Sequence, residues 1–162
     1  MTTEQQLIDG ILRNWKFNTD RFEAFVRDLT DEQLEERIAP GRNRLLYLLG
    51  HIAAVHDRML PLLGIGARRH QDLDAFFLEN PDGGAASPVP VARLKEILLE
   101  VDETLSSALS AWTPADWLAK HTTVSDEDFA REPHRNRMSV VLSRNTHLAF
   151  HYGQVILTGP RN

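Results

Sequence analysis

The sequence predicts an all-α fold organised as a four-helix bundle, and three observations lead to this prediction. Apolar residues recur with helical periodicity in four long segments, which are separated by stretches rich in glycine, proline and polar residues. No segment alternates between apolar and polar residues regularly enough to indicate a strand. A long connection joins the second and third helical segments and can cross one end of a bundle. Residues 1–162 are therefore expected to form a single domain.

The first long helix is expected over about residues 4–28, where apolar side chains form a stripe that is interrupted at Asn18 and Thr19. These two polar residues are interpreted as groups that could face a functional cavity. Downstream, Thr30 and Gln33 have the spacing of a capping box, in which each side chain caps a backbone amide of the other residue. This pattern predicts a short helix directly after Thr30.

The second long helix is expected from about residue 43 to residue 63, with Gly64 as its terminator. It is so dense in leucine and other apolar residues that it should be largely buried. Residues 64–90 contain several glycines and prolines and are expected to form the long crossover connection, with a short helix over about residues 72–78.

The third long helix, over about residues 88–111, has the cleanest apolar stripe in the chain and carries no histidine, so we expect it to serve in packing. A Thr-Pro pair at 113–114 is typical of the N-cap and first position of one more short helix. Residues 121–136 are expected to be irregular. The fourth long helix should begin near residue 138 and end at Gly159, which is followed by a proline.

The composition argues against several classes of protein. Cysteine is absent, so the chain has no disulfide, no thiolate metal ligand and no cysteine nucleophile, and a metal would be held by His, Asp or Glu. The net charge of −5 and the lack of a basic block argue against nucleic-acid binding. Charged residues occur throughout the first helical segment, and no apolar run is long enough to span a membrane. We therefore expect a cytoplasmic protein that does not associate with membranes.

Three histidines have the arrangement of a metal site. His147 and His151 are four residues apart and share one face of the fourth helix, so both imidazoles can bind one ion. His51 lies in an otherwise apolar row of the second helix, which should turn it inward toward the same point. A metal held by three imidazoles keeps coordination positions open for water or substrate, which distinguishes a catalytic site from a structural one.

The alternative interpretation is that these histidines are ordinary core residues, because two histidines four apart on a helix often arise by chance. His56 is turned about 140° away from His51 and is interpreted as a packing residue. The acidic run 126–128 has no histidine at ligand spacing and is interpreted as a solvated turn. The remaining histidines that we considered lie in expected loops or at element ends and are interpreted as solvated: His70, His121 and His134.

Two side chains near the histidine pair are candidate catalytic residues. Arg144 precedes His147 by about one turn and could bind the anionic group of a substrate, although a surface ion pair explains it equally well. Gln154 could hydrogen-bond a ligand imidazole or a bound water. Gly153, next to it, is interpreted as a position of close helix packing.

Two segments carry a resemblance to a known family: Leu48-Leu-Gly-His-Ile-Ala-Ala-Val-His56 and His147-Leu-Ala-Phe-His-Tyr-Gly-Gln154. They resemble the DinB-like superfamily of bacterial metal-binding four-helix bundles, and the similarity covers nearly the whole chain. The segment 132–137 is similar to the approach to the last helix in one branch of that superfamily. The resemblance implies a homodimer, and it implies that the three metal ligands are His51, His147 and His151.

Members of this superfamily include thiol-dependent transferases and isomerases, proposed hydrolases and proteins without an assigned activity. The resemblance therefore implies an enzyme for a small-molecule substrate, in which a divalent metal acts as a Lewis acid toward a thiol or water. Because the chain has no cysteine, the thiol would be a low-molecular-weight cosubstrate. The alternatives are a metal-dependent hydrolase and a bundle that binds a metal or small ligand without turnover. Zinc or nickel is expected first, with iron, copper or manganese as alternatives.

Overall fold

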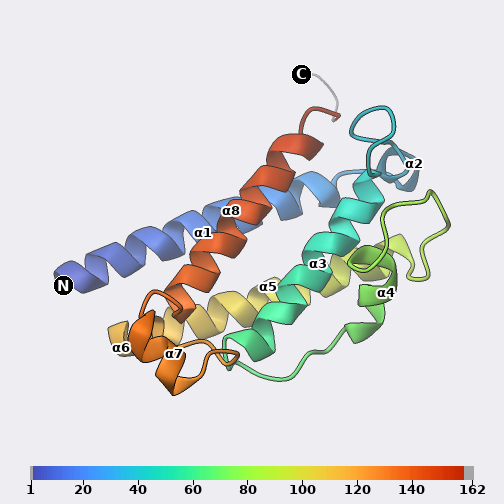
Figure 1. The fold of residues 1–162 in the computed structure, drawn as a ribbon. Coiled ribbons are helices and arrows are strands. Elements are labelled where there is room, and N and C mark those ends of the chain that lie inside the picture. The colour runs from blue at the N-terminus through green and yellow to red at the C-terminus, as the bar shows by residue number, and fades with distance from the viewer. Residues whose placement is uncertain (1, 159–162) are drawn as a thin grey trace.

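The computed structural model describes residues 2–158, in which the long elements are all α-helices (Figure 1). Within that range the chain forms eight α-helices and one 3-10 helix, with no strand beyond two isolated bridges, so the all-α prediction is confirmed. None of these helices has both the length and the apolar character that a membrane span requires. Four of them are long: α1 (Thr3–Arg27), α3 (Leu45–Leu62), α5 (Val91–Ala111) and α8 (Arg137–Val155).

The long helices pack mainly in two pairs (Figure 1). α3 packs most extensively against α5, and α8 packs most extensively against α1, while α1 also contacts α5. The contact between α3 and α8 is sparser. Most residues of α3 are buried, including Leu49 and Ile52, which confirms the expected burial of the second long helix. The narrower classification as a four-helix bundle stays a prediction, because short helices accompany the four long ones.

The first short helix, α2 (Asp31–Leu34), lies where the capping-box pattern predicted it. The Oγ1 atom of Thr30 accepts a hydrogen bond from the backbone amide of Gln33 at 3.3 Å. The Gln33 side chain in turn accepts a hydrogen bond from the Thr30 amide at 2.9 Å. Both halves of the capping box are therefore present, and the prediction is confirmed.

The long connection between α3 and α5, for which we keep the name crossover, contains the 3-10 helix Gln71–Leu73 and α4 (Asp74–Phe77), which confirms the short helix expected there. Gly64 has a φ of 69°, a left-handed conformation that glycine adopts without strain, and it turns the chain away from the end of α3. Beyond α5, Thr113 caps α6 (Pro114–Leu118), the other short helix that was predicted.

Residues 121–136 are not irregular throughout, because they contain α7 (Asp126–Arg131). Ser125 caps this helix, and its hydroxyl accepts a hydrogen bond from the amide of Asp128 at 3.0 Å. The acidic run 126–128, which we interpreted as a solvated turn, is the first turn of α7. Carboxylates interact favourably with the positive end of a helix dipole, so an acidic run directly after a capping serine stabilises the start of a helix.

α8 begins at Arg137, and the Asn136 side chain caps it by accepting a hydrogen bond from the Ser139 amide at 2.9 Å. The helix ends at Val155, which is earlier than the sequence predicted. The expected cap at Gly159 lies outside the described residues.

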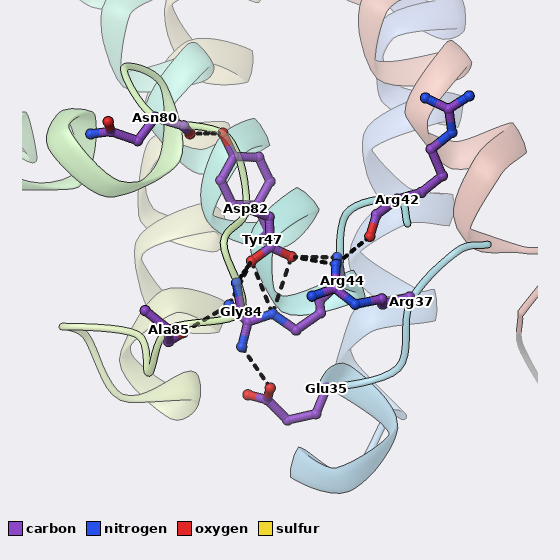
Figure 2. Close-up of polar contacts among 9 residues, drawn as sticks. All are labelled: Glu35, Arg37, Arg42, Arg44, Tyr47, Asn80, Asp82, Gly84 and Ala85. Carbon is purple, nitrogen blue, oxygen red and sulfur yellow. Dashed lines mark hydrogen bonds and ion pairs between the residues drawn. The ribbon is translucent and has the colours of Figure 1, made fainter. Parts of the chain in front are cut away.

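A buried ion pair fastens the crossover to the start of α3 (Figure 2). Arg44 donates hydrogen bonds to both carboxylate oxygens of Asp82, whose side chain is fully buried, and also to Glu35 and to the carbonyl of Ala85. Burial alone would raise the pKa of Asp82, but hydrogen bonds from Arg44 and from the Gly84 amide hold that pKa at about 2. The crossover is therefore held against the start of α3 by buried hydrogen bonds and an ion pair.

Candidate metal centre

The structure brings the three predicted imidazoles together from two helices. His51 lies on α3, and His147 and His151 lie one turn apart on α8. The Nε2 atom of His147 is 3.2 Å from Nε2 of His51 and 3.1 Å from Nε2 of His151. Each side chain offers one nitrogen within 4.8 Å of the others, and all three are partly buried. We call these three side chains the imidazole cluster.

Hydrogen bonds on the far side of two rings determine which nitrogens face the centre. The Nδ1 atom of His51 lies 2.9 Å from the carbonyl oxygen of Phe77, which can only accept a hydrogen bond, so Nδ1 carries the proton. The Nδ1 atom of His151 likewise donates to Oε1 of Gln154 at 2.8 Å. Both neutral rings therefore present the lone pair of Nε2 toward His147.

A cation fits these lone pairs better than protons do. If His147 carries its proton on Nε2, that proton can be donated to only one of the two facing nitrogens. Its buried Nδ1 has no hydrogen-bond partner among residues 2–158. Imidazole nitrogens on a tetrahedral zinc ion lie about 2.0–2.1 Å from the metal and about 3.4 Å from one another. The observed separations of 3.1 and 3.2 Å are close to that ligand spacing, so the residues present fit a metal ion.

The electrostatics of the cluster also favour lone-pair donation at neutral pH. Burial lowers the pKa of His51 and of His151. Burial, together with the two neighbouring imidazoles, lowers the pKa of His147 to about 4. The positive charge of Arg144 acts in the same direction on His51 and His147. Protons therefore compete weakly for these nitrogens at pH 7, which favours metal binding.

Phe77 reaches His51 because the crossover packs tightly onto α3. Its ring covers Gly50, where a Cβ atom would come within 2.3 Å of Cε1 of Phe77. The ring is fully buried and packs against Tyr47, with ring centroids 5.9 Å apart. The Tyr47 hydroxyl donates to the carbonyl of Asn80 at 2.6 Å and holds the end of this segment (Figure 2). These contacts place the last carbonyl of α4 against the His51 ring.

The sequence suggested that Gly153 permits close helix packing, but the glycine that does so is Gly50. Gly153 is exposed, and a Cβ atom there would meet nothing within 4 Å. The sequence did contain a signal for this role, because Gly50 lies inside a densely apolar helix, where a glycine often marks a close approach of another segment. The Phe77 carbonyl had no sequence signal, because every residue supplies the same backbone group.

The two candidate catalytic residues lie beside the cluster. Gln154 hydrogen-bonds His151, while Arg144 is half-buried about one turn before His147. In the part of the chain that the structure describes, Arg144 makes no hydrogen bond and no ion pair, so the alternative of a surface ion pair has no support there. The catalytic roles of Arg144 and Gln154 stay predictions.

The polar break in the first helix does not contribute contacts to the imidazole cluster. Asn18 donates a hydrogen bond to Asn145 on α8 at 2.8 Å. The Thr19 hydroxyl donates to the backbone of its own helix, at the carbonyl of Trp15. Both side chains are buried, and their hydrogen bonds serve the packing of α1 rather than the cluster.

His56 is fully buried, as the packing interpretation predicted, but its partner was missed. Its Nδ1 atom donates to Asp102 on α5, a helix to which we had assigned only apolar packing. Asp102 follows the buried Leu98 by four residues and so lies on the inward face of α5, which was the available signal. The His56 ring also packs against Trp15, with ring centroids 5.2 Å apart.

The three histidines that were interpreted as solvated differ in their exposure to solvent. His134 is exposed and His121 is partly buried. The solvated interpretation is wrong for His70, whose side chain is only 12% exposed and whose Nε2 lies 3.8 Å from Glu100.

A comparison with protein families matches a range of the chain that includes the imidazole cluster. The DinB superfamily model matches residues 14–155, a range that contains α3, most of α1 and all of α5 and α8. The three histidines of the imidazole cluster all lie within it. A search among curated proteins finds no match to the chain.

Proposed function

This chain belongs to the DinB superfamily, and from that membership and the imidazole cluster we propose that it is a metal-dependent enzyme that activates a small thiol for transfer or isomerisation. His51, His147 and His151 would hold one divalent ion, zinc or nickel first, with iron, copper or manganese as alternatives. Bound there, the ion supplies Lewis-acid chemistry that lowers the pKa of a thiol or water toward neutrality. The convergence of the three Nε2 atoms is the observation that carries the proposal.

In this proposal the long helices act as a four-helix bundle in which α3 and α8 supply the ligands. The Phe77 carbonyl and the Gln154 side chain orient the rings of His51 and His151 and set their tautomers. Arg144 supplies a positive charge beside the cluster, where a thiolate or the acid group of a substrate would lie. The crossover covers one side of His51 and limits the access of water.

Thiol chemistry is favoured over hydrolysis by what surrounds the cluster. Metal-dependent hydrolases commonly add a general base beside the metal-bound water, and no carboxylate in the described part of the chain hydrogen-bonds to the three rings. Asp57, a carboxylate on the same helix as His51, is buried and bound to Arg68 and to the amides of Arg69 and His70. A thiol has a lower intrinsic pKa than water and needs no such base.

Elemental analysis of protein purified without a histidine tag tests the metal site. The natural chain and His134→Ala, an exposed histidine outside the cluster, should each carry about one metal ion per chain. His147→Ala should carry roughly a tenth of that or less, because two imidazoles hold a divalent ion far more weakly than three. Equal metal content in all three proteins would remove the site.

A substrate screen then separates the reaction classes. The metal-loaded protein should consume small thiols together with electrophilic partners, and His147→Ala should not. Turnover of esters or amides without a thiol would assign the protein to the hydrolases instead. If metal removal lowers the melting temperature while neither class of substrate is consumed, the ion serves to join α3 and α8 without catalysis.

The expected homodimer is retained as part of this proposal. Three large apolar side chains at and beyond α8 are each at least 42% exposed: Leu142, Phe150 and Leu157. We expect these side chains to become buried against a second copy of the chain. Sedimentation velocity should therefore give the mass of two chains, and Phe150→Ser should shift the population toward the monomer. A monomer at all concentrations would remove this part of the proposal.

A further inference from the structure

A groove lies along the first half of α8, and Arg144, three residues before His147, is the lining residue next to the imidazole cluster in the sequence. The groove has a volume of about 360 Å³ and lies between the end of α3, at Leu62, and the first half of α8. The segment that leads into α8 forms its other side, and the amide of Thr122 donates to the Leu62 carbonyl at 3.0 Å, which fixes that segment against α3 (Figure 1). We call this the α8 groove. The lining residues used below are His121, His134, Arg135, Ser139, Ser143 and Arg144.

The α8 groove is positive on a chain that is negative overall. Its lining includes two arginines and two histidines and, among the described residues, no carboxylate, although the chain has a net charge of −5. A second groove, between α1 and α5, has the opposite character, since four acids and one lysine line it. Arg135 is partly neutralised by Glu132 at 3.2 Å, so Arg144 is the main positive group in the α8 groove.

Arg144 links the groove to the imidazole cluster. It lies in one row of α8 with His147 and His151, because residues that are three, four or seven positions apart share a helix face. Its charge acts on the rings of both His51 and His147, which places its guanidinium within electrostatic reach of the cluster. The side chain is half-buried and makes no hydrogen bond or ion pair with residues 2–158, so its donors are available to a ligand.

We propose that the α8 groove binds the oxyanion end, a carboxylate or phosphoryl group, of the small molecule whose reactive atom meets the imidazole cluster. The guanidinium of Arg144 would donate to two of its oxygens, and the hydroxyls of Ser139 and Ser143 supply further donors. Along the helix axis, Arg144 lies about 4.5 Å from His147 and about 10.5 Å from His151. The ligand therefore carries its oxyanion a few bonds away from its reactive atom. The link to a reactive atom rests on the proposed function, whereas anion binding in the groove does not.

Anion binding is tested on the metal-free protein by NMR. Titration with hexanoate and, separately, with hexylphosphonate should shift the amide signals of groove residues, and hexan-1-ol should not. Arg144→Gln should weaken the binding roughly tenfold or more, which is the usual contribution of a charged hydrogen-bonding partner. Arg93→Gln, a partly exposed arginine on α5 that pairs with Glu96 and lies outside the groove, is the control and should bind as the natural chain does. The anion that loses more affinity in Arg144→Gln identifies the oxyanion.

Either of two results would overturn the proposal in this titration. One is the absence of shifts in the groove, and the other is equal anion affinity in the natural chain and Arg144→Gln. These results do not depend on the metal, so they are distinct from a failure of the proposed function.

The link to the cluster is tested on cobalt-loaded protein. Binding of a thiol to the metal is followed by the charge-transfer absorption of a cobalt thiolate. We expect 6-mercaptohexanoate to bind roughly tenfold tighter than 6-mercaptohexan-1-ol, with the preference lost in Arg144→Gln and kept in Arg93→Gln. Equal binding of acid and alcohol by the natural chain would overturn the link. A chain that takes up no cobalt but binds hexanoate in the groove would refute the proposed function and support the anion site.

Discussion

Two histidines of α3, His51 and His56, differ in what faces their ring nitrogens. In the imidazole cluster, neutral oxygens of Phe77 and Gln154 accept the Nδ1 protons, and the remaining lone pairs face one another. One and a half turns along α3, the Nδ1 proton of His56 is donated to the carboxylate of Asp102, which also faces Glu23. We call His56, Asp102 and Glu23 the His56 cluster.

The difference shows how the partner of an imidazole decides its use. A carbonyl fixes the tautomer but adds no charge, so the imidazole cluster still needs a cation to satisfy its lone pairs. A carboxylate fixes the tautomer and adds a negative charge, so the Nδ1 proton of His56 has a charged acceptor, and the His56 cluster serves the packing of α3, α5 and α1. The same residue type is thus a candidate ligand at one position and a structural residue at the other.

The largest effect should come from breaking the His56 cluster. His56→Ala would leave the buried carboxylate of Asp102 without its partner, and we expect it to lower the free energy of unfolding of the metal-free protein by about 3–5 kcal/mol. His147→Ala should change the same quantity by only about 1 kcal/mol, because it removes contacts between neutral, half-buried rings and leaves no buried charge without a partner. Urea denaturation of both variants measures this, and similar losses in the two would contradict the distinction.

The next largest effect concerns the carbonyl that orients His51. Gly50→Ala would place a Cβ atom 2.3 Å from the Phe77 ring and displace α4. We expect metal affinity to fall about 10–100-fold, as for other losses of a group that orients a ligand. Competition with a coloured chelator gives the affinity. Gly153→Ala is the control, since a Cβ atom there meets nothing within 4 Å, and a similar loss in that variant would show that Phe77 is not responsible.

The third prediction concerns the effect of Glu23, a member of the His56 cluster, on stability as the pH changes. Burial, followed by the charge of Asp102, raises the pKa of Glu23 from 4.5 to about 8. The folded protein therefore holds a proton that the unfolded chain releases between those values, so the contribution of Glu23 to stability falls as pH rises through this window and is level above it. The other titratable groups that act on Glu23 are Asp20 and Lys16.

Glu23→Gln should remove that part of the decline in stability between about pH 5 and pH 8. Urea denaturation at several pH values measures the slope for the natural chain, for Glu23→Gln and for Glu96→Gln, an exposed residue on α5 that serves as control. If Glu23→Gln and the natural chain have the same slope, Glu23 does not hold that proton in the folded protein.

The smallest effect is expected at the second orienting group of the imidazole cluster. Gln154→Leu removes the acceptor for Nδ1 of His151 and should lower metal affinity by about tenfold while leaving the melting temperature of the metal-free protein nearly unchanged. Gln6→Leu, an exposed position on α1, is the control. Unchanged affinity in Gln154→Leu would mean that water can orient the ring equally well.

Much of the fold and part of the candidate site followed from local rules. Periodicity located the four long helices, and the capping box at Thr30 located α2, because these patterns depend on neighbours three or four residues apart. α7 was missed because the polar composition around it concealed its Ser125 cap. The pairing of His56 with Asp102 was missed because it joins residues 46 positions apart, for which no local pattern exists.

The sequence by itself determined the helical periodicity, the exclusion of cysteine chemistry and the face that His147 and His151 share, since each depends only on residue type and helical spacing. Tertiary structure decided that His51 meets that pair, and that Gly50 admits the Phe77 ring so that a backbone carbonyl sets the tautomer of His51. It also decided that Arg144 lines a positive groove. These features arise from contacts between helices, whose relative placement depends on how the buried faces pack together rather than on the order of residues within any one of them.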